Sequence, residues 1–118
     1  MIRVLLADDK HEVRSALALL VQEQAGMSVA AEAAEAEGLL QAVQETHPDV
    51  VLLDWELPGP GGRQLLAALR RVAPGVRVVA LSGRSEARQA AVQAGADAFA
   101  SKGEPPERLL EILHSFGG

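Results

Sequence analysis

Apolar runs of strand length alternate with stretches of helical periodicity along the whole chain. A short run that is apolar throughout predicts a strand buried in a sheet, and apolar residues recurring every three or four positions predict an amphipathic helix that covers it. The predicted strands are residues 2–7, 28–31, 49–54, 76–81 and 96–100. The apolar positions of the predicted helices are Val13, Leu17, Leu20 and Val21, then Ala36, Leu39, Leu40 and Val43, then Leu65, Leu66, Leu69 and Val72, and last Leu109, Leu110, Ile112, Leu113 and Phe116, with a further helix over residues 85–94.

Turn-forming residues separate these elements. Gly26 and Gly95 follow predicted helices, where glycine readily takes the left-handed conformation that ends a helix. His47-Pro48 closes the second helix, and residues 58–62 form a loop rich in proline and glycine. Five strand–helix pairs predict an α/β fold, a five-stranded parallel sheet that is doubly wound, with helices on both faces. We expect one domain over residues 1–118.

Composition narrows the classes of protein. The chain has 118 residues, 48% of them hydrophobic, which suits one packed domain. No apolar run approaches the roughly 18 residues of a membrane span, and no segment has the pattern of a signal peptide. Cysteine is absent, which excludes disulfides and thiolate metal sites and fits a cytoplasmic protein. The net charge is −5 and the basic residues are scattered, so we expect no membrane partner and no direct binding of nucleic acid.

Polar residues stand where the predicted strands end. Asp8 and Asp9 follow the first strand, Asp54 ends the third, Ser82 follows the fourth and Lys102 follows the fifth. The carboxyl ends of parallel strands meet at one edge of the sheet, so we expect these side chains to lie together.

Three carboxylates at one edge repel one another and raise each other's pKa. A divalent cation relieves this repulsion, and an all-oxygen donor set without cysteine or a nearby histidine favours Mg²⁺. Lys102 adds a compact cation and Ser82 adds a hydroxyl donor. A carboxylate nucleophile, a metal ion and a positive side chain are the groups that hold a transferring phosphoryl group.

At these positions the sequence resembles the response regulator receiver domain of bacterial two-component systems, in the CheY-like superfamily, over essentially its whole length. The resemblance implies a flavodoxin-like strand order of 2-1-3-4-5. It rests on Asp8-Asp9, the segment Val-Leu-Leu-Asp-Trp-Glu-Leu-Pro-Gly around Asp54, Gly62, Leu81-Ser82-Gly83, Gly95-Ala96-Asp97-Ala98-Phe99 and Lys102.

The resemblance implies a role for each residue of the acidic group. Asp54 is expected to accept the phosphoryl group from a phosphohistidine. Asp9 and Asp54, with the backbone carbonyl of Glu56, are expected to bind Mg²⁺ directly, and Asp8 is expected to act mostly through water. The domain is then no enzyme in the ordinary sense, because it catalyses only its own phosphoryl transfer and dephosphorylation.

The same resemblance assigns the remaining positions. Ser82, the backbone of Gly83 and Lys102 are expected to bind phosphoryl oxygens. When Ser82 moves toward the phosphoryl group, Phe99 is expected to rotate into the space it leaves and change the face built from the fourth helix, fifth strand and fifth helix. Glu56 and Arg84 occupy positions that tend to set the phosphoryl lifetime, and we hypothesise that their side chains pair and slow hydrolysis.

Some residues depart from the family pattern or have a simpler explanation. Ser82 replaces the commoner threonine, and Phe99 replaces a frequent tyrosine. Asp8-Asp9 could form an ordinary turn and helix cap, Ser82 could cap a turn, and Phe99 could be a core aromatic that never moves. Trp55 is expected to cover the site partly and to serve as a fluorescence reporter.

The partners implied are a sensor histidine kinase or phosphotransfer protein, and an output domain or a downstream protein. Pro105-Pro106 and the tail at residues 116–118 favour a longer regulator of transcription over a stand-alone receiver. Homodimer formation on phosphorylation is left open.

Two rival functions are a receiver that works as an interaction module without phosphorylation, and a Mg²⁺-dependent phosphatase or nucleotide-binding enzyme. The second lacks support, because no glycine-rich phosphate loop follows the first strand.

Overall fold

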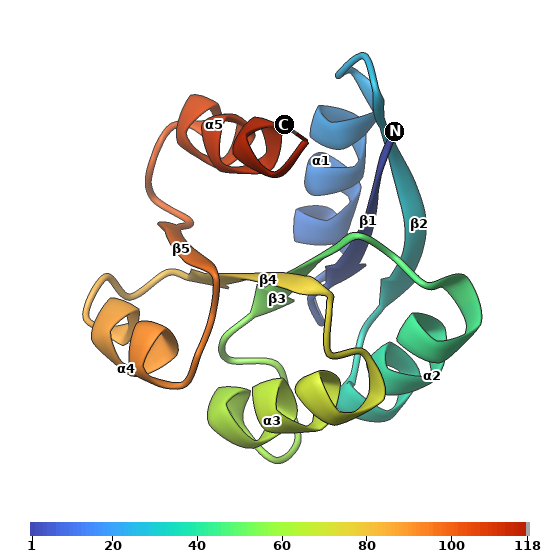
Figure 1. The fold of residues 1–118 in the computed structure, drawn as a ribbon. Coiled ribbons are helices and arrows are strands. Elements are labelled where there is room, and N and C mark those ends of the chain that lie inside the picture. Colours follow the sequence, from blue (N-terminus) through green and yellow to red (C-terminus); the bar gives the residue numbers. More distant parts are fainter. Residues whose placement is uncertain (118) are drawn as a thin grey trace.

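The computed structural model describes residues 1–117 and contains one parallel sheet in the order β2-β1-β3-β4-β5. The strands are β1 (Ile2–Ala7), β2 (Met27–Ala33), β3 (Val50–Asp54), β4 (Arg77–Ser82) and β5 (Ala98–Ser101). The helices are α1 (His11–Gln22), α2 (Ala36–Thr46), α3 (Gly62–Val72), α4 (Ala87–Gln93) and α5 (Pro106–Phe116). Helices α1 and α5 cover one face of the sheet, and α2, α3 and α4 cover the other (Figure 1). The predicted doubly wound α/β fold and its strand order are confirmed.

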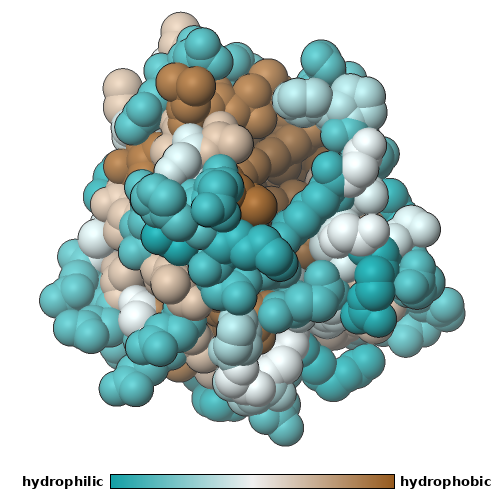
Figure 2. All heavy atoms as spheres, turned by 180° about the vertical axis from the view of Figure 1, so that it is seen from behind, coloured by the Kyte–Doolittle hydropathy of each residue, from teal (hydrophilic) through white to brown (hydrophobic). Residues whose placement is uncertain are grey.

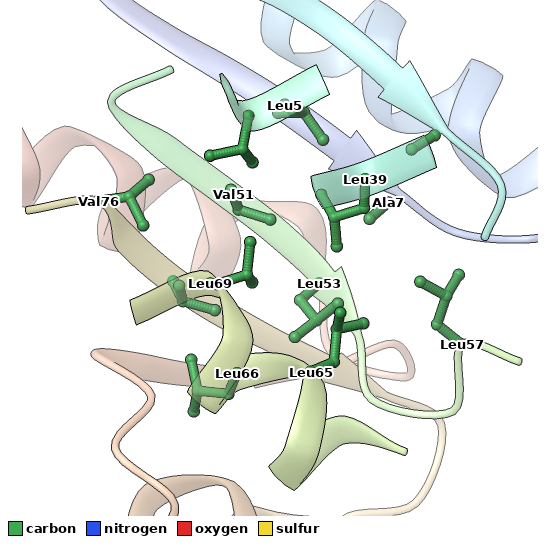
Figure 3. Close-up of a cluster of buried hydrophobic side chains, with 13 residues drawn as sticks. Leu5, Ala7, Leu39, Val51, Leu53, Leu57, Leu65, Leu66, Leu69 and Val76 are labelled. Carbon is green, nitrogen blue, oxygen red and sulfur yellow. The ribbon is translucent and has the colours of Figure 1, made fainter. Parts of the chain in front are cut away.

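Alternate residues of the central strands feed two separate cores. Leu5, Val51 and Leu53 point to the face covered by α2 and α3, where they pack with leucines of both helices (Figure 3). Leu6 and Leu52 point to the opposite face and pack against α1 and α5. Both faces of β3 are therefore buried, which explains why this strand is apolar at every position before its terminal aspartate.

Helix α4 is shorter than the sequence pattern predicted. It begins at Ala87 rather than at residue 85, because the N–H groups of Ala87 and Arg88 bond three residues back, to Arg84 and Ser85, and form turns. Its other end follows the prediction, since Gly95 has a φ of +102° and lies just beyond the helix.

Strand boundaries also shift from the predicted ones. β2 is longer than residues 28–31, because it pairs with β1 from Met27 to Ala33. β3 and β4 each begin one residue later than predicted, and β5 begins at Ala98 rather than at residue 96. Asp97 lies just before β5. Its carboxylate accepts a hydrogen bond from the backbone N–H of Val78 at 2.7 Å.

The last turn of α3 and the end of the chain also differ from the predictions or lie beyond them. Val72, predicted as core, is 39% exposed because it lies in the last turn of α3. Gly118, part of the tail predicted to begin a linker, lies outside the described residues. Within residues 1–117, no helix combines the length and the apolar character needed to cross a membrane.

Candidate functional site

The register of the sheet brings the predicted polar residues to one edge. Ala7 pairs with Leu53, so Asp8 and Asp54 leave neighbouring strands at the same level. Asp54 pairs with Leu81, and Ser82 pairs with Ser101, which places Lys102 one residue beyond this edge. The convergence expected from parallel strand ends is therefore present.

The strand ends share one local turn. In each, a polar side chain accepts the backbone N–H of the residue two positions later: Asp8 from Lys10 at 2.9 Å, Asp54 from Glu56 at 3.0 Å and Ser82 from Arg84 at 3.0 Å. Such turns orient short polar side chains toward the strand end. The turn-forming role considered for Asp8 and Ser82 is thus real, and it coexists with their membership of the site.

Three carboxylates gather in the pocket formed by these turns. Asp8, Asp9 and Asp54 each present an oxygen within 4.8 Å of the others. Asp8 and Asp54 are only 1% and 2% exposed, whereas Asp9 faces solvent. Buried carboxylates at this separation repel one another strongly unless cations compensate them.

Lys102 supplies part of that compensation. Its Nζ lies 2.8 Å from Oδ2 of Asp8 and 3.4 Å from Oδ1 of Asp54. The lysine therefore bridges the first and third strands from a position after the last one. One ammonium against two of the three carboxylates leaves these four side chains with an excess of negative charge.

The titration of these groups follows from their surroundings. Burial raises the pKa of Asp54 above its ordinary value; the N–H of Glu56 and the charge of Lys102 oppose this rise without cancelling it. Burial by itself lowers the pKa of Lys102, but the hydrogen bond to Asp8 and the charge of Asp54 outweigh it, so that this pKa also lies above its ordinary value. The raised pKa of Asp54 thus follows mainly from burial, and the raised pKa of Lys102 follows from its two carboxylate partners.

Ser82, Glu56 and Arg84 form a second polar group beside the acids. The Ser82 hydroxyl lies 2.9 Å from each carboxylate oxygen of Glu56. Nη2 of Arg84 lies 3.3 Å from Oε2 of Glu56, so the predicted pairing of these two side chains is present. Gly83, whose backbone was predicted to bind phosphoryl oxygens, is exposed between Ser82 and Arg84.

Phe99 lies apart from the acidic pocket, in a small cluster on the α4 side of the sheet. Its ring is 2% exposed and packs with Ala80, Ala87 and Ala91. The guanidinium of Arg88 covers the ring, 4.8 Å from its centre. The role of Phe99 as a switch stays a prediction.

Trp55 packs against the hydrophobic clusters on the α3 and α4 side of the sheet, and its partial cover of the site and its use as a reporter stay predictions. Its side chain packs against Gly62 at the start of α3, where an added Cβ would come within 2.5 Å of the indole. It also contacts the cluster that contains Phe99. The indole therefore contacts both the start of α3 and the cluster beside α4.

Arg14 supports the site and was not predicted. Its Nη1 donates to the backbone carbonyl of Asp8 at 2.9 Å, and its Nε donates to Glu32 of β2 at 3.2 Å. A signal for it exists in the sequence, because Arg14 stands three and seven residues before Leu17 and Val21, on the otherwise apolar stripe of α1.

The donor set of the pocket fits a hard divalent cation. The side chains of Asp8, Asp9 and Asp54 offer only oxygen atoms, close enough to share one ion. Mg²⁺ prefers such carboxylate donors and keeps open positions for water and phosphate oxygens. The three histidines of the chain are all exposed and lie outside this group.

An apolar groove of about 440 Å³ opens next to the acidic pocket, between α1 and α5. Lys102 contributes to its wall, so the groove and the pocket adjoin. Figure 2 shows apolar surface gathered above a polar zone on this side of the molecule. The groove is lined by Glu12, Val13, Ala16, Leu17, Leu20, Leu81, Ala100, Ser101, Lys102, Glu104, Pro105, Pro106, Arg108 and Leu109.

The sheet order and the acidic pocket at its carboxyl edge define a flavodoxin-like α/β protein with a group of carboxylates that could hold a metal ion. The family model for the response regulator receiver domain matches residues 4–114, and the chain belongs to this family. It is therefore a receiver domain of two-component signal transduction, a class of domain that binds Mg²⁺ at its acidic pocket.

Several known proteins share this similarity. The response regulator UvrY of Escherichia coli is 32% identical over 117 residues, which cover 98% of this chain and 54% of UvrY. The response regulator GacA of Pseudomonas viridiflava is 36% identical over 115 residues, which cover 96% of this chain and 54% of GacA. The chain spans about half the length of these curated relatives.

A solved structure agrees with the sequence comparison. The crystal structure of a two-component response regulator of the LuxR family, from Aurantimonas sp., superposes with a TM-score of 0.87 at 32% sequence identity. The match covers 96% of this chain and 85% of that one. Relatives of this chain thus include regulators of the LuxR family.

Proposed function

We propose that this receiver domain accepts a phosphoryl group on Asp54 from a phosphohistidine of a sensor histidine kinase or phosphotransfer protein. The N–P bond of the phosphohistidine breaks, and an O–P bond forms to a carboxylate oxygen of Asp54. The observation that carries this proposal is the gathering of three carboxylates within 4.8 Å, with the ammonium of Lys102 against two of them.

The two oxygens of Asp54 have different surroundings. Oδ1 accepts the N–H of Glu56 at 3.0 Å and faces Lys102 at 3.4 Å, so we assign the phosphoryl group to Oδ2. Both oxygens of Asp8 already accept hydrogen bonds, from Lys10 and Lys102, which supports a water-mediated role for Asp8 toward the metal. Asp9, Asp54 and the backbone carbonyl of Glu56 would hold Mg²⁺ directly. When bound, the ion neutralises charge shared between the carboxylates and the phosphoryl oxygens.

The remaining groups would bind the phosphoryl oxygens and transmit the effect of phosphorylation to the surface of the domain. Lys102, the Ser82 hydroxyl and the backbone of Gly83 would each bind one oxygen, and Phe99 would follow the movement of Ser82. The signal would leave through the face made by α4, β5 and α5. This is a two-state equilibrium, biased by contacts that the phosphoryl group makes in only one of the two arrangements.

The output would lie in a part of the regulator outside residues 1–118, which form the receiver alone in this proposal. UvrY and GacA are named response regulators, and a Bacillus subtilis relative, 32% identical, is named as a transcriptional regulatory protein. We therefore assign the domain to the control of transcription in the cytoplasm, with homodimer formation on phosphorylation as an additional expectation. Its own chemistry would be limited to phosphoryl transfer and autodephosphorylation.

The test is phosphorylation by acetyl phosphate in the presence of Mg²⁺, followed by intact mass spectrometry. We expect the parent to gain one phosphoryl group and Asp54→Asn to gain none. Asp49→Asn is the matched control, because Asp49 is exposed at the opposite end of β3 and accepts the N–H of Arg3. Phosphorylation of Asp54→Asn at the parental level would overturn the proposal, and failure of the parent to react would favour the phosphorylation-independent interaction module.

A further inference from the structure

The hydroxyl of Ser82 is already committed to a carboxylate. The side chain is fully buried, and its Oγ lies 2.9 Å from Oε1 and from Oε2 of Glu56. A hydroxyl has a single proton to donate, so it serves only one acceptor at a time. The backbone N–H of Arg84 donates to the same Oγ at 3.0 Å and thereby leaves the proton directed at Glu56.

Glu56 is held in place to receive that proton. Nη2 of Arg84 lies 3.3 Å from its Oε2, and its own backbone N–H donates to Asp54 at 3.0 Å. The acceptor is an ionised carboxylate, so the bond from Ser82 is charge-assisted and stronger than one between neutral groups. Ser82 has no access to water. If its hydroxyl breaks the hydrogen bond to Glu56, the hydroxyl therefore needs another acceptor within the protein or its ligand.

We propose that Glu56 is a positioning residue that sequesters the Ser82 hydroxyl, so that a phosphoryl group on Asp54 must displace the Glu56 carboxylate to receive this hydrogen bond. The inference rests on the proposed function. It assigns Glu56 a role in how readily the domain takes up its phosphorylated arrangement, which is separate from any effect on the water that hydrolyses the aspartyl phosphate. Arg84 stabilises the sequestered arrangement from both sides, by its backbone and by its side chain.

The experiment is a double-mutant cycle on the affinity for beryllofluoride with Mg²⁺, measured by calorimetry on the full chain. The variants are Glu56→Ala, Ser82→Ala and the double substitution. We expect Glu56→Ala to tighten binding roughly threefold to tenfold when Ser82 is present, because one competing hydrogen bond is removed. The same change should have a clearly smaller effect in the Ser82→Ala background.

The cycle separates sequestration from simple charge. Removing Glu56 also removes a negative charge near the anion, and that effect persists without the Ser82 hydroxyl. Equal effects of Glu56→Ala in both backgrounds, or no tightening at all, would overturn the inference. Glu86→Ala is the matched control for loss of one exposed acidic charge nearby, and Ser82→Thr, which keeps a hydroxyl, should keep the coupling.

Failure of the inference and failure of the proposed function have different signatures. If the parent binds beryllofluoride, Asp54→Asn does not, and the cycle shows no coupling, the phosphoacceptor function stands and the sequestration is wrong. If the parent does not bind, or Asp54→Asn binds equally well, both are wrong. Thermal unfolding of each variant checks that the changes in affinity occur in folded protein, and Glu56→Gln, which keeps an acceptor oxygen, should fall between the parent and Glu56→Ala.

Discussion

The ammonium of Lys102 lies 2.8 Å from Oδ2 of Asp8, and this ion pair ties the residue after the last strand to the residue after the first. Asp8 is 1% exposed, so its charge depends on Lys102 for compensation. A metal ion in the pocket would compensate the same carboxylates. We therefore expect Lys102 and Mg²⁺ to act as partial substitutes for each other in the stability of the domain.

The shared role of Lys102 and Mg²⁺ in charge compensation predicts how the variant Lys102→Met will behave. Without divalent cations, the variant should lose about 3 kcal/mol of unfolding free energy, near the low end for a broken buried pair because the lysine side chain is 24% exposed. Mg²⁺ should restore much of this loss and stabilise the variant more than the parent. Chemical denaturation with EDTA and with Mg²⁺ measures both values. An equal gain from Mg²⁺ in the two proteins would contradict the shared role, and Lys10→Met serves as the control because Lys10 contributes only its backbone to the pocket.

A second prediction concerns Asp54 and pH. The pKa of Asp54 is raised in the folded domain, so the folded state holds this proton more tightly than the unfolded state. The contribution of Asp54 to stability therefore falls as the pH rises from the ordinary value of 3.8 through the folded pKa, and the charged form costs stability above it. Asp54→Asn should be more stable than the parent near neutral pH in EDTA, and this advantage should vanish in acid below that window.

Urea denaturation across the pH range measures this difference. Glu45→Gln, at an exposed position of α2, controls for loss of a carboxylate on the surface. Addition of Mg²⁺ should narrow the gap, because the ion stabilises the ionised parent more than the amide variant. A parent that is more stable than Asp54→Asn in EDTA at neutral pH would show that Lys102 and Glu56 compensate the buried charge fully.

The packing of Trp55 on Gly62 predicts a sharp response to one methyl group. In Gly62→Ala the new Cβ would lie 2.5 Å from the indole, so the ring must move. We expect a loss of about 1–3 kcal/mol in unfolding free energy and a changed tryptophan emission spectrum. Gly75→Ala meets no atom within 4 Å and should alter neither property. Identical emission from Gly62→Ala and the parent would mean that the contact is not maintained in solution.

The ion pair between Glu56 and Arg84 predicts a modest effect on the lifetime of the aspartyl phosphate. The two side chains are 39% and 61% exposed, so water screens them and the pair is worth less than about 1 kcal/mol. Arg84→Ala should therefore hydrolyse its phosphoryl group faster by no more than about fivefold. Decay followed by mass spectrometry gives the rate. Arg108→Ala, which breaks an exposed pair with Glu111 on α5, should decay at the parental rate, and an unchanged rate in Arg84→Ala would remove the pair from lifetime control.

The convergence of polar residues at the carboxyl ends of the strands was the most predictable feature of the molecule. The apolar run before Asp54 and the alternation of strands and helices were enough to predict the sheet, because a parallel sheet forces its carboxyl ends to one edge. Once that edge is fixed, the meeting of Asp8, Asp54 and Lys102 follows from their positions in the chain.

Contacts between side chains of different elements were not predictable in the same way. The orientation of Trp55 depends on the absence of a side chain at Gly62, and the role of Arg14 depends on how closely α1 approaches the end of β1. Helix α4 began late because backbone turns at Ser85 competed with the helix, which periodicity does not register. These features depend on packing distances, and a sequence pattern states only which face a residue occupies.

The bond between Lys102 and Asp8 joins residues that are 94 positions apart. During synthesis on the ribosome, Asp8, Asp9 and Asp54 emerge well before Lys102, whose ammonium compensates their charge. A growing or prematurely terminated polypeptide that stops before residue 98 lacks both the ammonium and the fifth strand. Under the proposed function, such fragments would lack the cation that lies against Asp8 and Asp54, so only chains extended past residue 102 would be equipped to accept the phosphoryl group.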